Sequence, residues 1–311
     1  MPKSKANPAL GWFYTLLSSL LFGLNAATSK VVVQAHISPE LVVIFRSGSS
    51  ALLAGLVLLI VNRRAFKVAR NQIPKLIIFG IGGIALMQWS YTNAVTLLPV
   101  GISLLFEYTA AIMTPVVMWI IYKRRPSTNL WWGAGLALSG LVVVSQIWKS
   151  DLNPLGVFFG FMAALCVVFY FVMGDYVQRD RDSLSTLFYA MLISCIFWLI
   201  VRHPSMASLP DLTGQLDLTG HLAGIRIPTW LVLVWFCVMG SFLPMLMGFA
   251  ALKNLSPTYV GIGSISEVIW AFVFGGLWLG EAMGGIQVIG AVLVVAGIVL
   301  AQSGSAKKQE Q

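Results

Sequence analysis

Apolar runs long enough to cross a lipid bilayer recur along the whole chain, and they constrain its fold more than any other feature. A bilayer-spanning helix needs about 17–25 mostly apolar residues. The sequence holds ten such runs, near 10–33, 39–61, 76–96, 100–121, 130–148, 155–177, 184–201, 229–252, 257–279 and 285–302. The runs are continuous, whereas the strands of a membrane β-barrel alternate between apolar and polar residues. Because backbone groups inside a bilayer must bond within the protein, we expect an all-α polytopic membrane protein of ten transmembrane helices.

The composition agrees with a chain whose main solvent is lipid. Of its residues, 58% are hydrophobic and 10% are charged, whereas about a quarter of the residues in a soluble domain are charged. The net charge of +9 comes from basic residues in short gaps between the apolar runs, a pattern that sets orientation in the membrane. We therefore expect the lipid bilayer and a small molecule as partners, and no nucleic acid.

Neither a metal site nor a disulfide framework is expected. The cysteines Cys166, Cys195 and Cys237 all fall inside apolar runs, and the three histidines lie in polar gaps without the spacing of metal ligands. The sequence holds no nucleotide-binding P-loop, so ATP cannot drive a process from within this chain. We expect no cofactor.

Lysine and arginine are distributed unevenly over the gaps between the runs. If the N-terminus is cytoplasmic, fifteen of them lie in segments that face the cytoplasm, and three, Lys149, Arg202 and Arg226, lie in segments that face outward. Positive charge is retained on the cytoplasmic side of membranes. This asymmetry predicts an even number of spans with both termini cytoplasmic. It also predicts that the segment 202–228 lies outside and that the segment from Arg63 to Lys75 lies inside.

Short sequence matches recur between the two halves of the chain. Leu10–Phe13 opens the first run and Leu155–Phe158 opens the sixth, which is an offset of 145 residues. Gly133–Gly140 lies in the fifth run and Gly290–Gly297 in the tenth, which is an offset of 157 residues. Both offsets indicate a repeating unit of five spans. Because five is odd, the second unit must enter the membrane with the opposite orientation.

Inverted repeats of this kind build many secondary transporters, in which the substrate binds between the halves. We predict a first repeat at 1–148, a second repeat at 155–302 and a cytoplasmic tail at 303–311.

Polar and helix-breaking residues occur in each half in the order found in one protein family. The first half holds Asn25, Lys30, Arg46 and a stretch from Leu98-Pro99-Val100-Gly101 through Glu107 to Pro115. The second half holds Leu255-Ser256-Pro257-Thr258, Glu267, Leu279-Gly280-Glu281 and the Gly290–Gly297 stretch. In this pattern the chain resembles the EamA family of the drug/metabolite transporter superfamily. It departs from the family at Val268, where a proline is usual, and at Lys123-Arg124-Arg125, where a glycine–glutamate pair is common.

The resemblance implies a secondary transporter of the cell membrane that exports amino acids or related small metabolites by alternating access. A metabolite importer or facilitator with the same fold is the alternative. An intramembrane enzyme is disfavoured, because the sequence has no HExxH helix, no paired intramembrane aspartates and no Gly-x-Ser-Gly site.

Glu267 is the first candidate for the chemistry of transport. It lies about ten residues into the ninth run, so near the bilayer midplane at ~1.5 Å per residue. A carboxylate at that depth is costly and usually faces a cavity or a partner. We predict that Glu267 faces a central polar cavity and couples protons to transport or binds a substrate ammonium. The alternative is a neutral, hydrogen-bonded residue that pins helices together. Nearby Gly261 and Gly263 allow either a helix distortion or ordinary close packing.

Glu107 and Tyr108 are the corresponding candidates in the fourth run. Pro115 follows them and removes a backbone donor, which makes this span a candidate broken helix that lines the cavity. Glu107 is expected on the cavity, in an ion pair with Arg46 of the second run, or both.

Two cations lie within the runs. Lys30 is near the end of its run, where it can extend toward the interface. Arg46 is deeper and needs a partner, for which Glu40 and Glu107 are the candidates. We expect these residues to form structural ion pairs, with capture of a substrate carboxylate as the alternative role of Arg46.

A third group is predicted to form an amphipathic pocket that accepts apolar or aromatic groups. Its members are polar or aromatic residues inside runs: Trp89, Trp235, Trp270, Gln88, Tyr91, Asn93 and Asn25. The alternative is that the aromatic members only pack within the bundle or face lipid. Pro244 in the eighth run is expected to kink its helix beside the same cavity.

Overall fold

The computed structural model describes residues 7–33, 37–123, 125–149, 151–202, 211–280 and 284–306, without the side chains of residues 30, 33 and 304–306. In this part of the chain, ten helices are long and apolar enough to cross a membrane. The predicted runs coincide with them closely; the third span, for example, begins at Ile73 rather than at 76. The all-α polytopic fold is therefore confirmed.

Among the first five spans, the third and fourth are interrupted helices and the other three are continuous. Their elements are α1 (Pro8–Val33), α2 (Pro39–Val61), α3 (Ile73–Ile78), η2 (Phe79–Ala85), α4 (Leu86–Leu97), α5 (Val100–Tyr108), α6 (Ala110–Tyr122) and α7 (Thr128–Ser145). Short 3₁₀ turns follow the second and fifth spans, η1 (Arg63–Phe66) and η3 (Ile147–Lys149).

The last five spans follow the same scheme. Their elements are α8 (Pro154–Val177), α9 (Ser183–Arg202), α10 (Thr229–Cys237), η6 (Val238–Phe242), α11 (Leu243–Asn254), α12 (Pro257–Ser264), α13 (Ser266–Leu279) and α14 (Gly285–Ala306). Proline opens four of the spans, at Pro8, Pro39, Pro154 and Pro257. A first-turn N–H has no partner within the helix, so proline costs nothing there.

The interruptions fall at matching places in the two halves. The third and eighth spans each contain a π-helical stretch, η2 and η6. The fourth and ninth spans are each broken at one residue, Thr109 and Ile265, where φ and ψ are −56° and −21° and −57° and −24°. Their N–H groups bond three residues back, to Phe106 and Ile262, both at 3.2 Å, which tightens the helix locally. The two halves are thus two repeats of one five-span unit.

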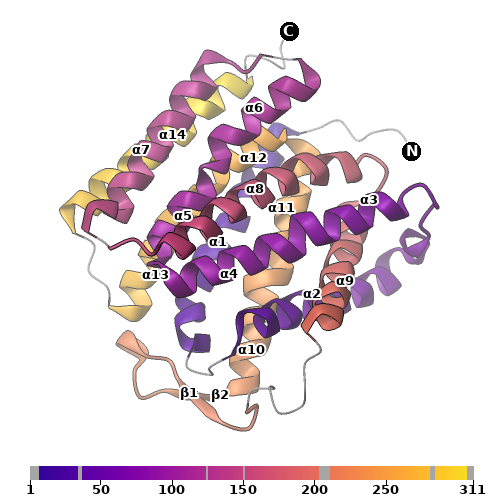
Figure 1. Ribbon diagram of the computed structural model, residues 1–311, viewed down its shortest axis with the longest axis horizontal. Helices are drawn as coiled ribbons and strands as arrows, with labels where there is room; N and C mark the ends of the chain where they lie inside the picture. The colour runs from indigo at the N-terminus through magenta and orange to yellow at the C-terminus, as the bar shows by residue number, and fades with distance from the viewer. Residues whose placement is uncertain are drawn as a thin grey trace.

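The fifth and tenth spans lie side by side at one edge of the molecule (Figure 1). Gly140 on α7 and Gly290 on α14 allow this close approach, since a β-carbon at Gly140 would lie 2.6 Å from the Gly290 carbonyl oxygen. A matching contact has the roles of the two helices exchanged: a β-carbon at Gly297 on α14 would lie 2.6 Å from the Gly133 carbonyl oxygen on α7. Small residues of this kind promote close helix packing in lipid, where burial of apolar surface supplies little driving force for helix association.

The segment 211–228, expected only as a polar connection, carries a small β-hairpin at the end of the bundle away from the chain termini (Figure 1). Strands β1 (Gln215–Asp217) and β2 (Arg226–Pro228) pair antiparallel, with Leu216 opposite Ile227. The turn η5 (Gly220–Leu222) lies between them, and the Trp278 indole at the end of α13 donates to the Leu218 carbonyl at 2.9 Å. We call this side of the molecule the hairpin end and the opposite side the termini end.

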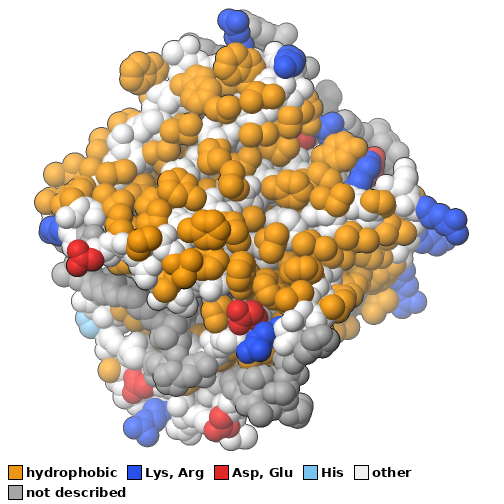
Figure 2. Space-filling view, viewed as in Figure 1, with side chains coloured by type: hydrophobic (Ala, Val, Ile, Leu, Met, Phe, Trp, Pro, Cys, Tyr) orange, Lys and Arg blue, Asp and Glu red, His pale blue; other side chains and the backbone are white. Residues whose placement is uncertain are grey.

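Apolar side chains cover most of the face seen in Figure 2, and charged ones lie mainly at its margins. Over the molecule as a whole, the exposed large apolar side chains include Leu52, Ile60, Leu165 and Val292. A soluble protein rarely shows such a continuous apolar surface, so this surface is the one that faces lipid.

Candidate functional site

A cavity of about 470 Å³ lies between the two halves. Side chains of seven spans line it, the first four together with the sixth, eighth and ninth. Glu107 and Tyr108 reach it from the end of α5, and Glu267 reaches it from the start of α13. The helix breaks at Thr109 and Ile265 therefore stand beside the carboxylates on the cavity wall.

Tyr108 and Glu267 are in direct contact across the cavity. The Tyr108 hydroxyl donates a 2.6 Å hydrogen bond to Oε2 of Glu267. Tyr108 is buried, whereas Glu267 is half-buried and borders the cavity. This bond ties the broken fourth span of one half to the broken ninth span of the other. Glu267 thus has both features weighed from the sequence, a hydrogen-bonded partner and access to a cavity.

Glu107 also lines the cavity, but its carboxylate makes no hydrogen bond or ion pair with any residue that the structure describes. The expected ion pair between Glu107 and Arg46 is wrong, because no guanidinium nitrogen of Arg46 lies within 4.0 Å of a carboxylate oxygen of Glu107.

Arg46 instead bonds to the backbone. Its Nη2 donates to the Gly240 carbonyl in η6 at 2.9 Å, and its guanidinium lies over the Phe236 ring, 5.6 Å from the centroid. Pro244 explains why the Gly240 carbonyl can accept this bond. Proline has no N–H, so the usual i→i−4 helix hydrogen bond to Gly240 is missing. The structure therefore also corrects the expected pair with Glu40.

Glu40 has other partners. Its Oε2 lies 3.8 Å from Nε of Arg202, and its Oε1 accepts from the Trp89 indole at 3.4 Å. The side chain of Lys30 lies outside the described residues. Among the described side chains of the three residues predicted to form ion pairs, only Glu40 forms one. Its partner, Arg202, was not predicted from the sequence.

The predicted amphipathic pocket is formed in part. Asn25, Gln88 and Tyr91 line the cavity. The residues absent from its walls are Asn93, Trp89, Trp235 and Trp270. The Asn93 amide instead bonds to the carbonyl of residue 89 in its own helix at 2.8 Å.

Trp89 and Trp270 pack against neighbouring aromatic rings. The ring centroid of Trp89 lies 5.5 Å from that of Trp198 and 5.3 Å from that of Phe159. The ring centroid of Trp270 lies 6.4 Å from that of Phe274. A helix of given sequence can turn either face to the cavity, and packing between helices decides which one it turns.

The predicted helix breaks are close to the observed ones but displaced. Pro115 lies inside the regular helix α6, and the break in that span falls six residues earlier, at Thr109. Gly261 and Gly263 lie in α12 just before the break at Ile265. Pro244 lies two residues after the π-helical stretch η6.

Several cavity residues gave no signal in the sequence. They are small polar or aromatic residues of a kind common in all spans, namely Ser18, Ser264, Tyr170, Phe171 and Phe236. Only the pairing of spans from the two halves brings them together.

The cavity extends farther toward the hairpin end than toward the termini end. It reaches Ile37 and Pro39, in and after the connection between α1 and α2. In the other direction its walls stop at residues such as Thr15 and Gly248, beyond which the buried rings of Trp12 and Phe249 fill the bundle.

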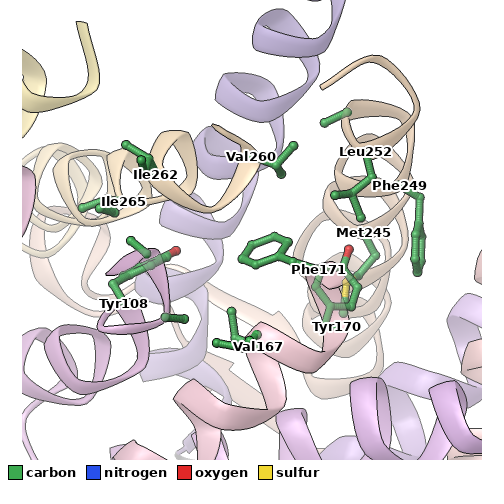
Figure 3. Packing of buried hydrophobic residues seen from close by; sticks show 14 of the residues in the cluster. Tyr108, Val167, Tyr170, Phe171, Met245, Phe249, Leu252, Val260, Ile262 and Ile265 are labelled. Carbon is green, nitrogen blue, oxygen red and sulfur yellow. The ribbon is translucent and has the colours of Figure 1, made fainter. Parts of the chain in front are cut away.

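Aromatic and aliphatic side chains from three helices make up this closed part. Figure 3 shows Tyr170 and Phe171 of α8, Met245 and Phe249 of α11 and Val260 of α12 converging there. Phe249 is fully buried, and its ring lies 5.5 Å from that of Tyr170. The cavity is therefore closed at this end mainly by packed aromatic and aliphatic side chains.

The sequence pattern of one family, described as the EamA-like transporter family, matches residues 9–146 and 154–302. The chain belongs to this family. The match covers both repeats, so the resemblance seen in the sequence is confirmed, and the cavity lies between the two matched segments. This EamA-like protein is thus a multi-pass membrane protein of a transporter family.

Two relatives and one solved structure show how far the similarity extends. The EamA-like chain is 26% identical over 295 residues to a probable amino-acid metabolite efflux pump of Salmonella typhimurium, covering 93% of each chain. It is 23% identical over 164 residues to protein PecM of Dickeya dadantii, covering 52% of this chain and 51% of PecM. A protein of known crystal structure shares the fold with a TM-score of 0.76 at 16% identity, over 99% of this chain and 100% of that one.

Proposed function

We propose that this protein exports amino acids or related small metabolites from the cell by alternating access, and that protons drive the export. The hydrogen bond between Tyr108 and Glu267 is the observation that carries this proposal. It joins the broken spans of the two halves at the cavity, which is where inverted-repeat transporters bind substrate and coupling ion.

The cavity suits a molecule of amino-acid size with an apolar part. Its volume of about 470 Å³ lies within the usual range for small-molecule sites. Its walls combine apolar side chains such as Phe171 and Met245 with the carboxylates Glu107 and Glu267. The Salmonella typhimurium relative, named a probable amino-acid metabolite efflux pump, supports the same substrate class and the outward direction.

Proton coupling is assigned to Glu267. A carboxyl group at this depth is costly to ionise, because the bilayer and the apolar walls solvate charge poorly. It can bind a proton when the cavity faces one side of the membrane and release it when the cavity faces the other. The Tyr108 hydroxyl can donate to the ionised carboxylate and so stabilise the form that has released its proton.

The orientation follows from the charge asymmetry between the connecting segments. We place both termini, the Arg63–Lys75 segment and the 303–311 tail in the cytoplasm, and the hairpin end outside the cell. The repeats 1–148 and 155–302 are then the two units that move against each other.

Transport by inside-out membrane vesicles tests the function. Vesicles that contain the protein should accumulate labelled amino acids when the lumen is acid relative to the bath, and vesicles without it should not. Accumulation in right-side-out vesicles under an inward proton gradient would instead support an importer of the same fold. Equal equilibration in both kinds of vesicle, independent of pH, would support a facilitator.

A further inference from the structure

Arg46 carries a positive charge in the cavity wall, and no carboxylate among the described residues contacts it. Its side chain is 7% exposed and lines the cavity. Among the residues that the structure describes, none offers a carboxylate oxygen within 4.0 Å of the guanidinium, and Nε has no hydrogen-bond partner. A buried cation without a counter-ion is costly, and proteins usually pair it.

The surroundings of Arg46 hold the guanidinium in place without a salt bridge, although Glu267 and Glu107 interact with its charge from beyond 4.0 Å. Nη2 is fixed by the Gly240 carbonyl at 2.9 Å, and the Phe236 ring lies beneath the guanidinium. Asn25 packs against the same glycine, because a side chain at Gly240 would collide with its Oδ1. A preorganised guanidinium loses little conformational freedom when it binds an anion.

Two neutral amides on the same cavity also have a polar atom without a partner. Oδ1 of Asn25 and Oε1 of Gln88 are buried and accept no hydrogen bond from any described residue. Both side chains line the cavity with Arg46. First-half spans therefore present one cation, which donates hydrogen bonds, and two amide oxygens, which accept them. The carboxylates Glu107 and Glu267 stand at the helix breaks.

We propose that Arg46 binds the carboxylate of the transported molecule, while the amide oxygens of Asn25 and Gln88 accept hydrogen bonds from its ammonium group. The planar fork of an arginine matches a carboxylate with two parallel N–H···O bonds. The proposal rests on the proposed function, in which amino acids are the substrates, and it adds that the carboxylate end is required for binding. An amine that lacks a carboxylate is then a poor ligand even though two glutamates line the cavity.

Binding of three matched ligands to the purified full-length protein in lipid nanodiscs tests the proposal. The ligands are leucine, leucinamide, which keeps only the ammonium, and 4-methylpentanoate, which keeps only the carboxylate; calorimetry gives the dissociation constants. Arg46→Gln should weaken binding of leucine and of 4-methylpentanoate by about 10- to 100-fold, which is the value of charge-assisted hydrogen bonds. It should leave leucinamide binding unchanged.

Two further variants separate the carboxylate role from a structural one. Arg46→Lys keeps a point charge but loses the fork, so it should weaken leucine binding less than Arg46→Gln, and it decides the question if Arg46→Gln does not fold. Arg63→Gln is the matched control, because Arg63 also donates to a backbone carbonyl, Leu59 at 2.9 Å, but lies outside the cavity. It should bind all three ligands as the wild type does.

The outcomes distinguish this proposal from the proposed function. Equal weakening of leucine and leucinamide, or no change for leucine, overturns the role of Arg46 and leaves amino-acid transport standing. Wild-type binding of 4-methylpentanoate but not leucine, with loss of that binding in Arg46→Gln, supports the carboxylate subsite and contradicts amino acids as substrates. Failure of the wild type to bind either carboxylate overturns both.

Discussion

The hydroxyl of Tyr108 and the carboxylate of Glu267 are 159 residues apart in the chain and 2.6 Å apart in space. Tyr108 is the last residue of α5 and Glu267 the second residue of α13. The bond therefore spans the two helix breaks and links the halves of the transporter at the cavity. The Tyr108–Glu267 pair can therefore couple a change at the cavity in one half to a change in the other half.

Replacing Glu267 by glutamine should abolish transport driven by a pH gradient. Glutamine keeps the shape of the side chain and an oxygen that accepts from Tyr108, but it cannot release a proton. Exchange of labelled for unlabelled substrate across proteoliposomes, which needs no net proton movement, should largely persist. Glu40→Gln is the control, because Glu40 pairs with Arg202 and does not line the cavity. Gradient-driven flux at the wild-type rate in Glu267→Gln would leave Glu267 a structural residue.

A double-mutant cycle should measure coupling between Tyr108 and Glu267. Tyr108→Phe removes the donor and Glu267→Ala removes the acceptor, and interhelical hydrogen bonds in membranes contribute about 0.6 to 1.7 kcal/mol. We expect a coupling energy in this range from unfolding of the single and double variants. Tyr170→Phe is the matched control, since Tyr170 lines the same cavity and no hydrogen bond from its hydroxyl to a described residue is found. Additive effects for Tyr108 would contradict the bond.

The orientation in the membrane can be tested by labelling introduced cysteines in a chain that lacks Cys166, Cys195 and Cys237. A membrane-impermeant reagent applied to intact cells should label a cysteine at Gly214, in the hairpin segment. It should label one at Ser127, the N-cap of α7, only after the cells are opened. The reverse result would invert the topology that the charge asymmetry predicts.

Two glycines of α7 should respond in opposite ways to alanine. At Gly140 a β-carbon would lie 2.6 Å from the Gly290 carbonyl oxygen and 2.7 Å from the Val294 nitrogen, whereas at Gly135 it would meet nothing within 4 Å. Gly140→Ala should therefore lower the unfolding temperature in detergent. Gly135→Ala should leave it unchanged or raise it, because alanine is favoured over glycine in a helix by roughly 0.5–1 kcal/mol. Equal effects at both sites would show that α7 and α14 do not pack this closely.

The hairpin should loosen when Asp217 loses its charge. Its carboxylate accepts from the N–H groups of Thr219 at 2.8 Å and Gly224 at 3.0 Å, and these hydrogen bonds hold the pKa of Asp217 below its usual value. Because the folded pKa is lowered, this contribution is present above the unfolded pKa of about 3.9 and is lost as the pH falls through the folded value. At neutral pH, Asp217→Asn should have the same effect and speed tryptic cleavage after Arg226.

Asp151→Asn is the control for this experiment, because Asp151 is exposed in a different connection. An unchanged rate of cleavage after Arg226 in Asp217→Asn would show that the carboxylate does not hold the turn.

The positions of the spans, their number and the repeat were predictable from the sequence. A bilayer excludes any backbone group that lacks an internal partner, so runs of sufficient length must become helices. The candidates Glu267, Glu107 and Tyr108 followed from the high cost of polar groups at such depth, and the structure places all three on one cavity.

The partners of these residues were decided only by the tertiary structure. The sequence offered carboxylates for Arg46, but the π-helical stretch η6 and Pro244 supply a carbonyl at Gly240 instead. Likewise Trp89 turns to Trp198 and not to the cavity. The apolar content of a run determines that it forms a membrane-spanning helix. The rotation of that helix, its breaks and its neighbours depend on contacts between segments more than a hundred residues apart.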